Sequence, residues 1–202
     1  MGIKEEEQQN IEQELAQEPQ SLGKRALKEC FDILKIFIIC SVVVYLITTF
    51  IAKPIKIEGD SMYPVLEDTE IGITNVFSAK YLDIKRGDVV IIYAKDNDEF
   101  WVKRVVGLPN ETISGKDDHV LINGKILDEP YLNTPYVNNI RKNEAFTKDF
   151  NQVKLGKEDY FLMGDNRIVS HDSRARGPFK RDDIVGKNAI IIYPFDKIKI
   201  VD

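Results

Sequence analysis

The sequence contains little cysteine and histidine, which excludes several classes of structural and metal site. Its two cysteines, Cys30 and Cys40, both lie in or beside the longest apolar run. The chain after residue 52 therefore has neither a disulfide framework nor a zinc site built from cysteine thiolates. The two histidines, His119 and His171, are too few for a histidine-rich metal site. We expect neither a metal ion nor another cofactor.

An excess of positive charge is also missing. The chain has 28 lysines and arginines against 33 aspartates and glutamates, which gives a net charge of -5. Proteins that bind nucleic acid present a basic face, so we expect no nucleic acid partner. The length of 202 residues suits one ordinary domain with a tail and an anchor, and no internal repeat is present.

One long apolar run divides the chain. No residue between Ile36 and Ala52 is charged, and these roughly 17 residues would form about 25 Å of helix, near the lower limit for crossing a bilayer core. Three apolar residues just before the run extend it, and Lys35 can reach the headgroups. The run is apolar on every face, unlike a buried helix of a soluble protein. We predict a transmembrane helix over residues 31–52.

A cleaved signal peptide is the main alternative origin of this run. The preceding tail, however, is long and rich in glutamate and glutamine, and no small-x-small cleavage site follows the run closely. An uncleaved anchor is therefore favoured. We predict an acidic tail over residues 1–30 and a separate domain over residues 53–202.

The charges beside the run favour one orientation. Four basic residues precede it and two follow it: Lys24, Arg25, Lys28 and Lys35, then Lys53 and Lys56. Because basic residues are retained on the cytoplasmic side, we expect a single-pass protein of the cell membrane. Its tail would be cytoplasmic and its C-terminal domain extracytoplasmic, and membrane lipid is then a partner.

Short apolar runs separated by turn signals fill the C-terminal domain. Asn123-Gly124 between apolar residues is the strongest of these turn signals, since both residues readily adopt positive φ. Residues 128–150 look irregular, and no long amphipathic helix is present. Many short strands and turns predict an all-β domain. The expected strands or hairpins cover residues 55–57, 70–76, 89–93, 100–106, 120–127, 160–163 and 185–193.

Three stretches contain the residue types of a hydrolytic site. They are Gly59–Pro64 (GDSMYP), Trp101–Pro109 (WVKRVVGLP) and Gly164–Arg174 (GDNRIVSHDSR). In this order they resemble the sequence boxes of type I signal peptidases, the membrane-anchored serine proteases that remove signal peptides from exported proteins. The resemblance covers most of the chain beyond the apolar run. It implies a largely antiparallel β domain and the same membrane arrangement.

The resemblance implies that Ser61 is the nucleophile and Lys103 its general base. A hydroxyl is a weak nucleophile and needs a neighbouring base. A lysine with the ordinary pKa near 10.4 is almost wholly charged at pH 7, so Lys103 needs a pKa nearer ~8. Burial among apolar side chains lowers a lysine pKa. Strand alternation puts Lys103 on the same face as Trp101 and Val105, where such burial is possible.

The resemblance also assigns supporting roles in the third stretch. Ser170 corresponds to a serine that hydrogen-bonds the lysine amine. Asp172 and Arg174 correspond to residues that form a structural ion pair behind the site. Asp165 and Asn166 would shape the loop. We further suggest that Asp165 pairs with Arg104.

The oxyanion hole and the substrate pockets are less clearly marked in the sequence. The Ser61 N–H can donate to the oxyanion. Some family members place a second donor, a serine, two residues before the nucleophile, but that position is Gly59 here. A backbone group of Gly59 or a water would have to replace it. Candidate wall residues of the substrate site are Met62 and Val102.

His171 supports a rival catalytic arrangement. It lies beside Asp172, so a triad of Ser61, His171 and an aspartate remains open. The family itself needs no histidine at this position.

The resemblance predicts cleavage of exported preproteins after small residues, usually Ala-x-Ala. The anchor would confine enzyme and substrate to one membrane surface and so raise their effective concentration. Two other functions remain open. One is an autoprotease with the same Ser-Lys chemistry, and the other is a catalytically silent, membrane-tethered scaffold that binds signal peptides.

Overall fold

The computed structural model describes residues 22–96 and 98–201. It divides into two units, residues 1–45 and residues 46–202. Most of the predicted acidic tail, residues 1–21, lies outside the described residues. Its last part, residues 22–30, is helical and belongs to the long helix α2.

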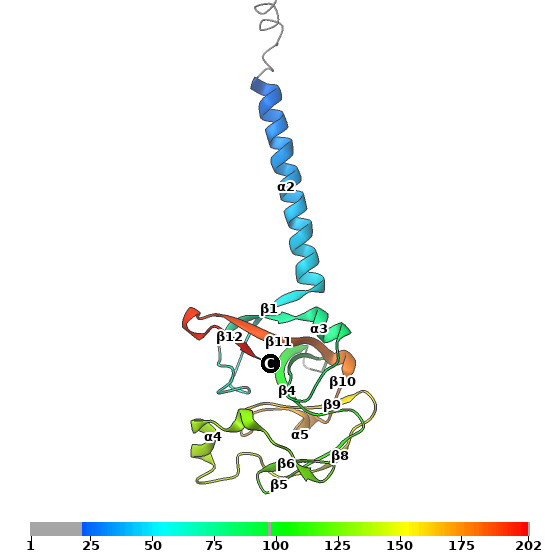
Figure 1. Ribbon diagram of the computed structural model, residues 1–202, viewed down its shortest axis with the longest axis vertical. Helices are drawn as coiled ribbons and strands as arrows, with labels where there is room; N and C mark the ends of the chain where they lie inside the picture. Colours follow the sequence, from blue (N-terminus) through cyan, green and yellow to red (C-terminus); the bar gives the residue numbers. More distant parts are fainter. Residues whose placement is uncertain (1–21, 97, 202) are drawn as a thin grey trace, which may run out of the picture. The chain divides into compact units, whose positions relative to one another are not determined.

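Helix α2 (Leu22–Phe50) begins nine residues before the predicted start and ends two residues before the predicted end. The early start follows from a run of good helix formers between Lys24 and Lys35. The early end follows from the strand that begins at Ala52, which includes Pro54 and the extended residue before it. Large apolar side chains cover every side of the helix, and Phe37 is 68% exposed. Within residues 22–96 and 98–201, α2 is the one helix long and apolar enough to cross a membrane (Figure 1).

The second unit contains a larger sheet in the order β1-β2-β11-β3-β4-β9-β10, with β12 paired to β11. All of its pairings are antiparallel. Its strands are β1 (Ala52–Lys56), β2 (Ile71–Asn75), β3 (Val89–Ala94), β4 (Glu99–Gly107), β9 (Asp159–Met163), β10 (Phe179–Lys180), β11 (Ile184–Tyr193) and β12 (Lys199–Val201). The prediction of a largely antiparallel β domain is confirmed.

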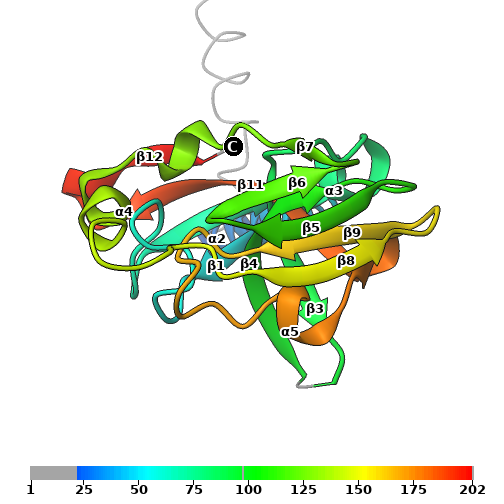
Figure 2. The same cartoon turned by 90° about the horizontal axis from the view of Figure 1, so that it is seen from below.

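A smaller antiparallel sheet has the order β7-β6-β5-β8. Its strands are β5 (Thr112–Lys116), β6 (His119–Ile122), β7 (Lys125–Ile126) and β8 (Phe150–Lys154). Figure 2 shows β5, β6 and β8 as neighbouring arrows. Asn123 and Gly124 join β6 to β7 with φ angles of 51° and 78°, which confirms the turn predicted there.

The core explains why β3 reads as an unbroken apolar run. Val89 packs with Met62 and Ile191 on one side of the sheet. Val90 packs with Val105 and other residues in a different cluster. A strand buried on both faces needs apolar residues at successive positions rather than at every second one.

Several short elements were not predicted from the sequence. They are β5, β8, β10 and β12, with the helices α3 (Val76–Tyr81), α4 (Pro135–Ile140) and α5 (Ser173–Arg176), and the 3₁₀ turns η1 (Pro130–Leu132), η2 (Arg181–Asp183) and η3 (Phe195–Lys197). The predicted strand 70–76 is shorter than expected because Asn75 caps α3: its side chain accepts a hydrogen bond of 2.7 Å from the Ser78 N–H.

Thr69 generates a prediction about stability. It lies between the loop that contains Ser61 and strand β2, with a φ of 68°. A β-branched residue in this backbone region costs on the order of 1–3 kcal/mol of folding free energy. Thr69→Gly should therefore raise the free energy of unfolding by about 1 kcal/mol, after allowing for the flexibility of glycine. Urea unfolding measures the change.

The matched control is Thr112→Gly in β5, where glycine should lower stability by roughly 0.5–1 kcal/mol. Equal losses in both variants would contradict a strained Thr69.

Candidate active site

Ser61 lies in a turn that is anchored in the core on both sides. The Tyr63 N–H donates to the Asp60 carbonyl at 3.2 Å, and the Leu66 N–H donates to the Met62 carbonyl at 2.9 Å. Met62 and Leu66 are both buried in the cluster that also contains Ile191. The turn is therefore fixed from below, while Ser61 itself is only half-buried.

Lys103 meets Ser61 from strand β4. Its Nζ donates to the Ser61 Oγ at 2.9 Å and to the Val102 carbonyl at 3.0 Å. The residue is only 4% exposed. Burial lowers the pKa of Lys103 to about 8, although the carboxylates of Asp172 and Asp165 act in the opposite direction. The sequence-predicted pair is therefore brought together, and its lysine has the lowered pKa that a base needs.

The loop after β9 is tied to the nucleophile through its backbone. The Asn166 N–H donates to the Ser61 carbonyl at 3.0 Å, and the Gly164 N–H donates to Asp172 Oδ2 at 3.0 Å. A Cβ at Gly164 would lie 2.3 Å from both the Ser61 carbonyl oxygen and Ser170 Oγ. Only glycine allows the two loops to approach this closely.

Two ion pairs flank this loop. Arg104 makes two hydrogen bonds of 2.8 Å to Asp165, as suggested from the sequence, and both side chains are almost fully buried. Arg174 likewise holds Asp172 through bonds of 2.9 and 2.8 Å. Burial acts to raise the pKa of Asp172, but the hydrogen bonds and charge of Arg174 outweigh it, so the pKa lies below its usual range. The Asp172 carboxylate therefore stays charged.

Two sequence expectations need correction. The Ser170 hydroxyl does not bond the lysine amine: its Oγ is buried and makes no hydrogen bond of acceptable geometry, although its proximity to Asp172 helps to lower the pKa of that carboxyl. The Gly59 N–H is not a free oxyanion donor, because it donates to Asp68 Oδ1 at 2.8 Å. Gly59 has a φ of 79°, which closes the loop back onto Asp68. The Ser61 N–H, in contrast, meets no acceptor among the described residues.

His171 has no role in positioning Ser61. It is exposed and contacts the Trp101 ring edge-on, with the ring centroids 5.6 Å apart. No hydrogen bond joins it to Ser61 or to an aspartate within the described residues, and Asp172 is already held by Arg174 and the Gly164 N–H. This geometry does not support the triad.

A groove of about 1010 Å³ runs past Ser61 and Lys103. Residues 53–62 form one wall, and residues 98–103 form another. Both predicted wall residues, Met62 and Val102, line it. Within the described residues, no group of three or more metal-ligating side chains is placed to hold a metal ion.

The comparisons with known proteins agree with this site. The family model described as "Signal peptidase, peptidase S26" matches residues 30–193. The chain belongs to the signal peptidase family.

Several relatives are similar over most of their length. "Signal peptidase I P" of Bacillus subtilis subsp. natto is 37% identical over 87% of this chain and 96% of its own. "Signal peptidase IB" of Staphylococcus aureus is 36% identical over 85% of this chain and 94% of its own. Among solved structures, a signal peptidase I from Enterococcus faecalis is 34% identical, with a TM-score of 0.48, over 52% of this chain and 95% of that one.

The family predicted from the sequence is therefore confirmed, and with it a hydrolase of the serine peptidase class. The roles of individual side chains stay predictions.

Sequence reasoning missed how this signal peptidase holds its third stretch. Arg167 has a fully buried side chain that bonds Glu129 and Thr147, both far away in the sequence. Tyr136 donates to the Asn166 Oδ1 at 3.4 Å. The only available signal was the irregular composition of residues 128–150, which does not indicate these partners.

The buried lysine of this signal peptidase generates a prediction about stability. A pKa of about 8 in the folded chain, below 10.5 in the unfolded chain, means that the charged lysine costs about 3 kcal/mol of folding free energy below pH 8. This cost disappears above pH 10.5, where both states are neutral. Lys103→Met should therefore stabilise the fold at pH 7 by about 2 kcal/mol, after loss of the hydrogen bond to Ser61.

Thermal unfolding checks this, with an expected rise in Tm of about 4–8 °C at pH 7 that shrinks as the pH approaches 10. A rise that is the same at every pH would contradict a buried charge as its source.

Proposed function

We propose that this chain is a membrane-anchored serine endopeptidase that removes N-terminal signal peptides from exported preproteins, with Ser61 as nucleophile and Lys103 as general base. The observation that supports this most directly is the 2.9 Å contact between Ser61 Oγ and the Nζ of a lysine that is 4% exposed. Arg104, next to it, cannot serve as the base, since a guanidinium does not deprotonate in proteins.

The reaction is an acyl transfer in two stages. Neutral Lys103 takes the Ser61 proton while Oγ attacks the scissile carbonyl carbon, and it then gives that proton to the leaving amine. A water activated by Lys103 next attacks the ester, which releases the signal peptide and restores the Ser61 hydroxyl. The Asn166–Ser61 backbone bond keeps Oγ in place through both stages.

Stabilisation of the oxyanion starts from the Ser61 N–H, which meets no acceptor among the described residues. Gly59 supplies no second N–H, because Asp68 holds it. A water could then act as the second donor to the oxyanion.

Specificity for small residues follows from a shallow groove floor. Met62 is 1% exposed and packed against Leu66 and Ile191, so it closes the space beneath Ser61 instead of leaving a deep pocket. Val102 is half-buried on the opposite wall. We expect small side chains such as alanine to pack best against this surface, because the buried Met62 offers no deep pocket for larger ones.

Two open strand edges support binding of the substrate as an extended strand. Residues 99–103 of β4 pair with β3 alone, because β9 pairs only with Arg104 to Gly107. Among the described strands, β1 pairs with β2 alone. Both edges line the groove, where their free backbone groups can bond a peptide.

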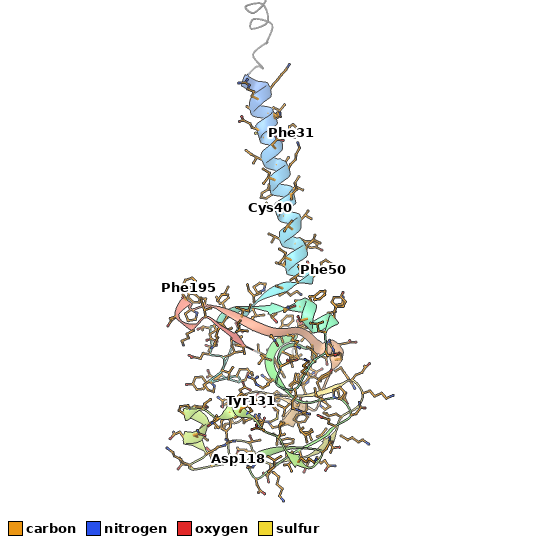
Figure 3. All side chains as sticks on the ribbon, viewed as in Figure 1. Phe31, Cys40, Phe50, Asp118, Tyr131 and Phe195 are labelled. Carbon is orange, nitrogen blue, oxygen red and sulfur yellow. The ribbon has the colours of Figure 1, made fainter. Side chains whose placement is uncertain are left out.

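The apolar helix α2 anchors the enzyme, with its N-terminal side cytoplasmic and the β domain outside, as the basic residues before the span indicate. An apolar face of the β domain is available to membrane lipid. Ile73, Ile190 and Ile200 are cross-strand neighbours on β2, β11 and β12, and they are 40%, 48% and 71% exposed. Phe195, 79% exposed, projects from the turn between β11 and β12 (Figure 3).

This face generates one prediction. Phe195→Lys combined with Ile200→Lys should slow cleavage of a preprotein embedded in lipid vesicles by about fivefold, because the lysines resist burial in the bilayer. Cleavage of a water-soluble peptide should not change. Ile126→Lys in β7, 64% exposed in the wild type, is the matched control. An equal loss with the control, or a loss with both substrates, would count against lipid contact.

The catalytic pair generates a second prediction. With a signal-peptide substrate in detergent, the wild-type rate should rise as the pH rises through about 8, because only neutral Lys103 accepts a proton. Ser61→Ala and Lys103→Ala should each lower kcat by at least about a thousandfold, and His171→Ala should leave it nearly unchanged. Retained cleavage in Lys103→Ala, together with loss in His171→Ala, would overturn the pair in favour of the triad.

A silent scaffold that only binds signal peptides remains the alternative function. Unchanged binding of signal peptides, with no cleavage of several substrates by the wild-type chain, would favour it.

A further inference from the structure

A second part of the domain, residues 129–147, holds the loop of residues 164–174, hereafter the catalytic loop, from outside the groove. This segment, hereafter the 129–147 segment, contains η1 and α4 and has a small apolar cluster of its own, formed by Leu132, Val137 and Phe146. None of its residues lines the groove. It nevertheless contacts both loops that meet at Ser61.

The strongest contact is with Arg167, whose side chain is fully buried. Its guanidinium donates to both carboxylate oxygens of Glu129, to Thr147 Oγ1 at 3.1 Å and to the Tyr131 hydroxyl at 3.4 Å. Its Nε donates to the Gly164 carbonyl at 3.1 Å. One end of the guanidinium is thus fixed by the 129–147 segment and the other by the backbone of the catalytic loop.

A second contact is with Asn166 and the nucleophile loop. The Tyr136 hydroxyl donates to Asn166 Oδ1 at 3.4 Å. The Tyr136 ring packs edge-on against Tyr63, two residues after the nucleophile, with the ring centroids 4.8 Å apart. Because the Asn166 N–H donates to the Ser61 carbonyl, Tyr136 contacts one partner of that bond directly and packs against Tyr63 in the turn that contains the other.

A third contact leads to the neighbour of Lys103. The Arg104 guanidinium lies 4.2 Å from the centroid of the Tyr131 ring and pairs with Asp165. Tyr131 is labelled in Figure 3. The residues Asp165, Asn166 and Arg167 are therefore all held, directly or through Arg104, by side chains of one segment.

These contacts make the segment more than a support for the fold. A displacement of about 1 Å of a reacting group costs on the order of a hundredfold in rate, and the Ser61 carbonyl is bonded to the loop that the segment holds. Burial and the Glu129 carboxylate raise the pKa of Tyr131 far above the working range. The Tyr131 hydroxyl therefore stays protonated while Lys103 gains and loses its proton.

We propose that the 129–147 segment is a clamp for the catalytic loop, with Glu129 and Tyr136 as positioning residues that hold Ser61 in reach of Lys103. The inference rests on the proposed peptidase function. It assigns to the connection between β7 and β8 of the smaller sheet a part in the rate of the reaction, separate from substrate binding.

The test compares Tyr136→Phe with wild type in the full chain, in detergent, with a signal-peptide substrate. The substitution keeps the ring against Tyr63 and removes only the hydroxyl. We expect kcat to fall about fivefold or more, KM to stay within twofold, and the Tm to change little. The midpoint of the rise in rate with pH should stay where it is in the wild type, because the burial of Lys103 is untouched. Tyr160→Phe is the matched control, a buried core tyrosine outside this network that should leave kcat unchanged.

Glu129→Gln provides a second, independent variant, measured at a temperature at which its unfolding curve shows it to be folded. It should also lower kcat with little effect on KM. Unchanged kcat in Tyr136→Phe and in folded Glu129→Gln would overturn the clamp. So would a loss of activity that matches the unfolded fraction alone. A wild-type chain that cleaves no signal-peptide substrate would overturn the proposed function, and this inference with it.

Discussion

The burial of the Lys103 amine beside the Ser61 hydroxyl is the interaction on which the rest of this structure depends. Lys103 must lose water to become a base, yet it must keep a partner for its remaining hydrogens, which the Val102 carbonyl and the Ser61 hydroxyl supply. Nearby negative charge would undo the effect by favouring the ammonium. The two nearest carboxylates, Asp165 and Asp172, are each matched by an arginine, so burial remains the dominant influence on the lysine.

The arginines also solve a geometric problem, because Ser61 lies in a loop and Lys103 lies in strand β4. Each guanidinium offers several donors in a fixed plane and can hold a carboxylate and a backbone carbonyl together. Arg104 bonds both Asp165 and the Gly87 carbonyl, and Arg167 bonds both Glu129 and the Gly164 carbonyl. Buried pairs of this kind are not strongly stabilising in themselves. Their value here is that they fix positions within a loop that has no regular backbone ladder.

The elements that could be predicted from the sequence are those marked by a short pattern of neighbouring residues. The apolar run at Val89–Ile92 predicted the buried strand β3. Asn123-Gly124 predicted the turn between β6 and β7. The sequence did not predict β5 or β8, whose residues are largely small or polar and become strands by pairing with each other. Ser61 and Lys103 were recognisable through their motifs. Glu129 was not, since it lies 38 residues from Arg167 and no local pattern links them. The bond expected between Ser170 and Lys103 does not form, and the buried Ser170 Oγ has no hydrogen-bond partner among the described residues.

The close approach at Gly164 has a consequence for when the enzyme becomes active. The contact exists only when the nucleophile turn and the third stretch have both docked, so the lysine cannot be enclosed by any fragment of the chain that ends before that stretch. A solvated lysine is neutral only about 0.04% of the time at pH 7. In a chain whose third stretch has not yet docked, a solvated Lys103 would therefore stay charged beside Ser61. Completion of the fold is therefore what lowers the pKa of Lys103.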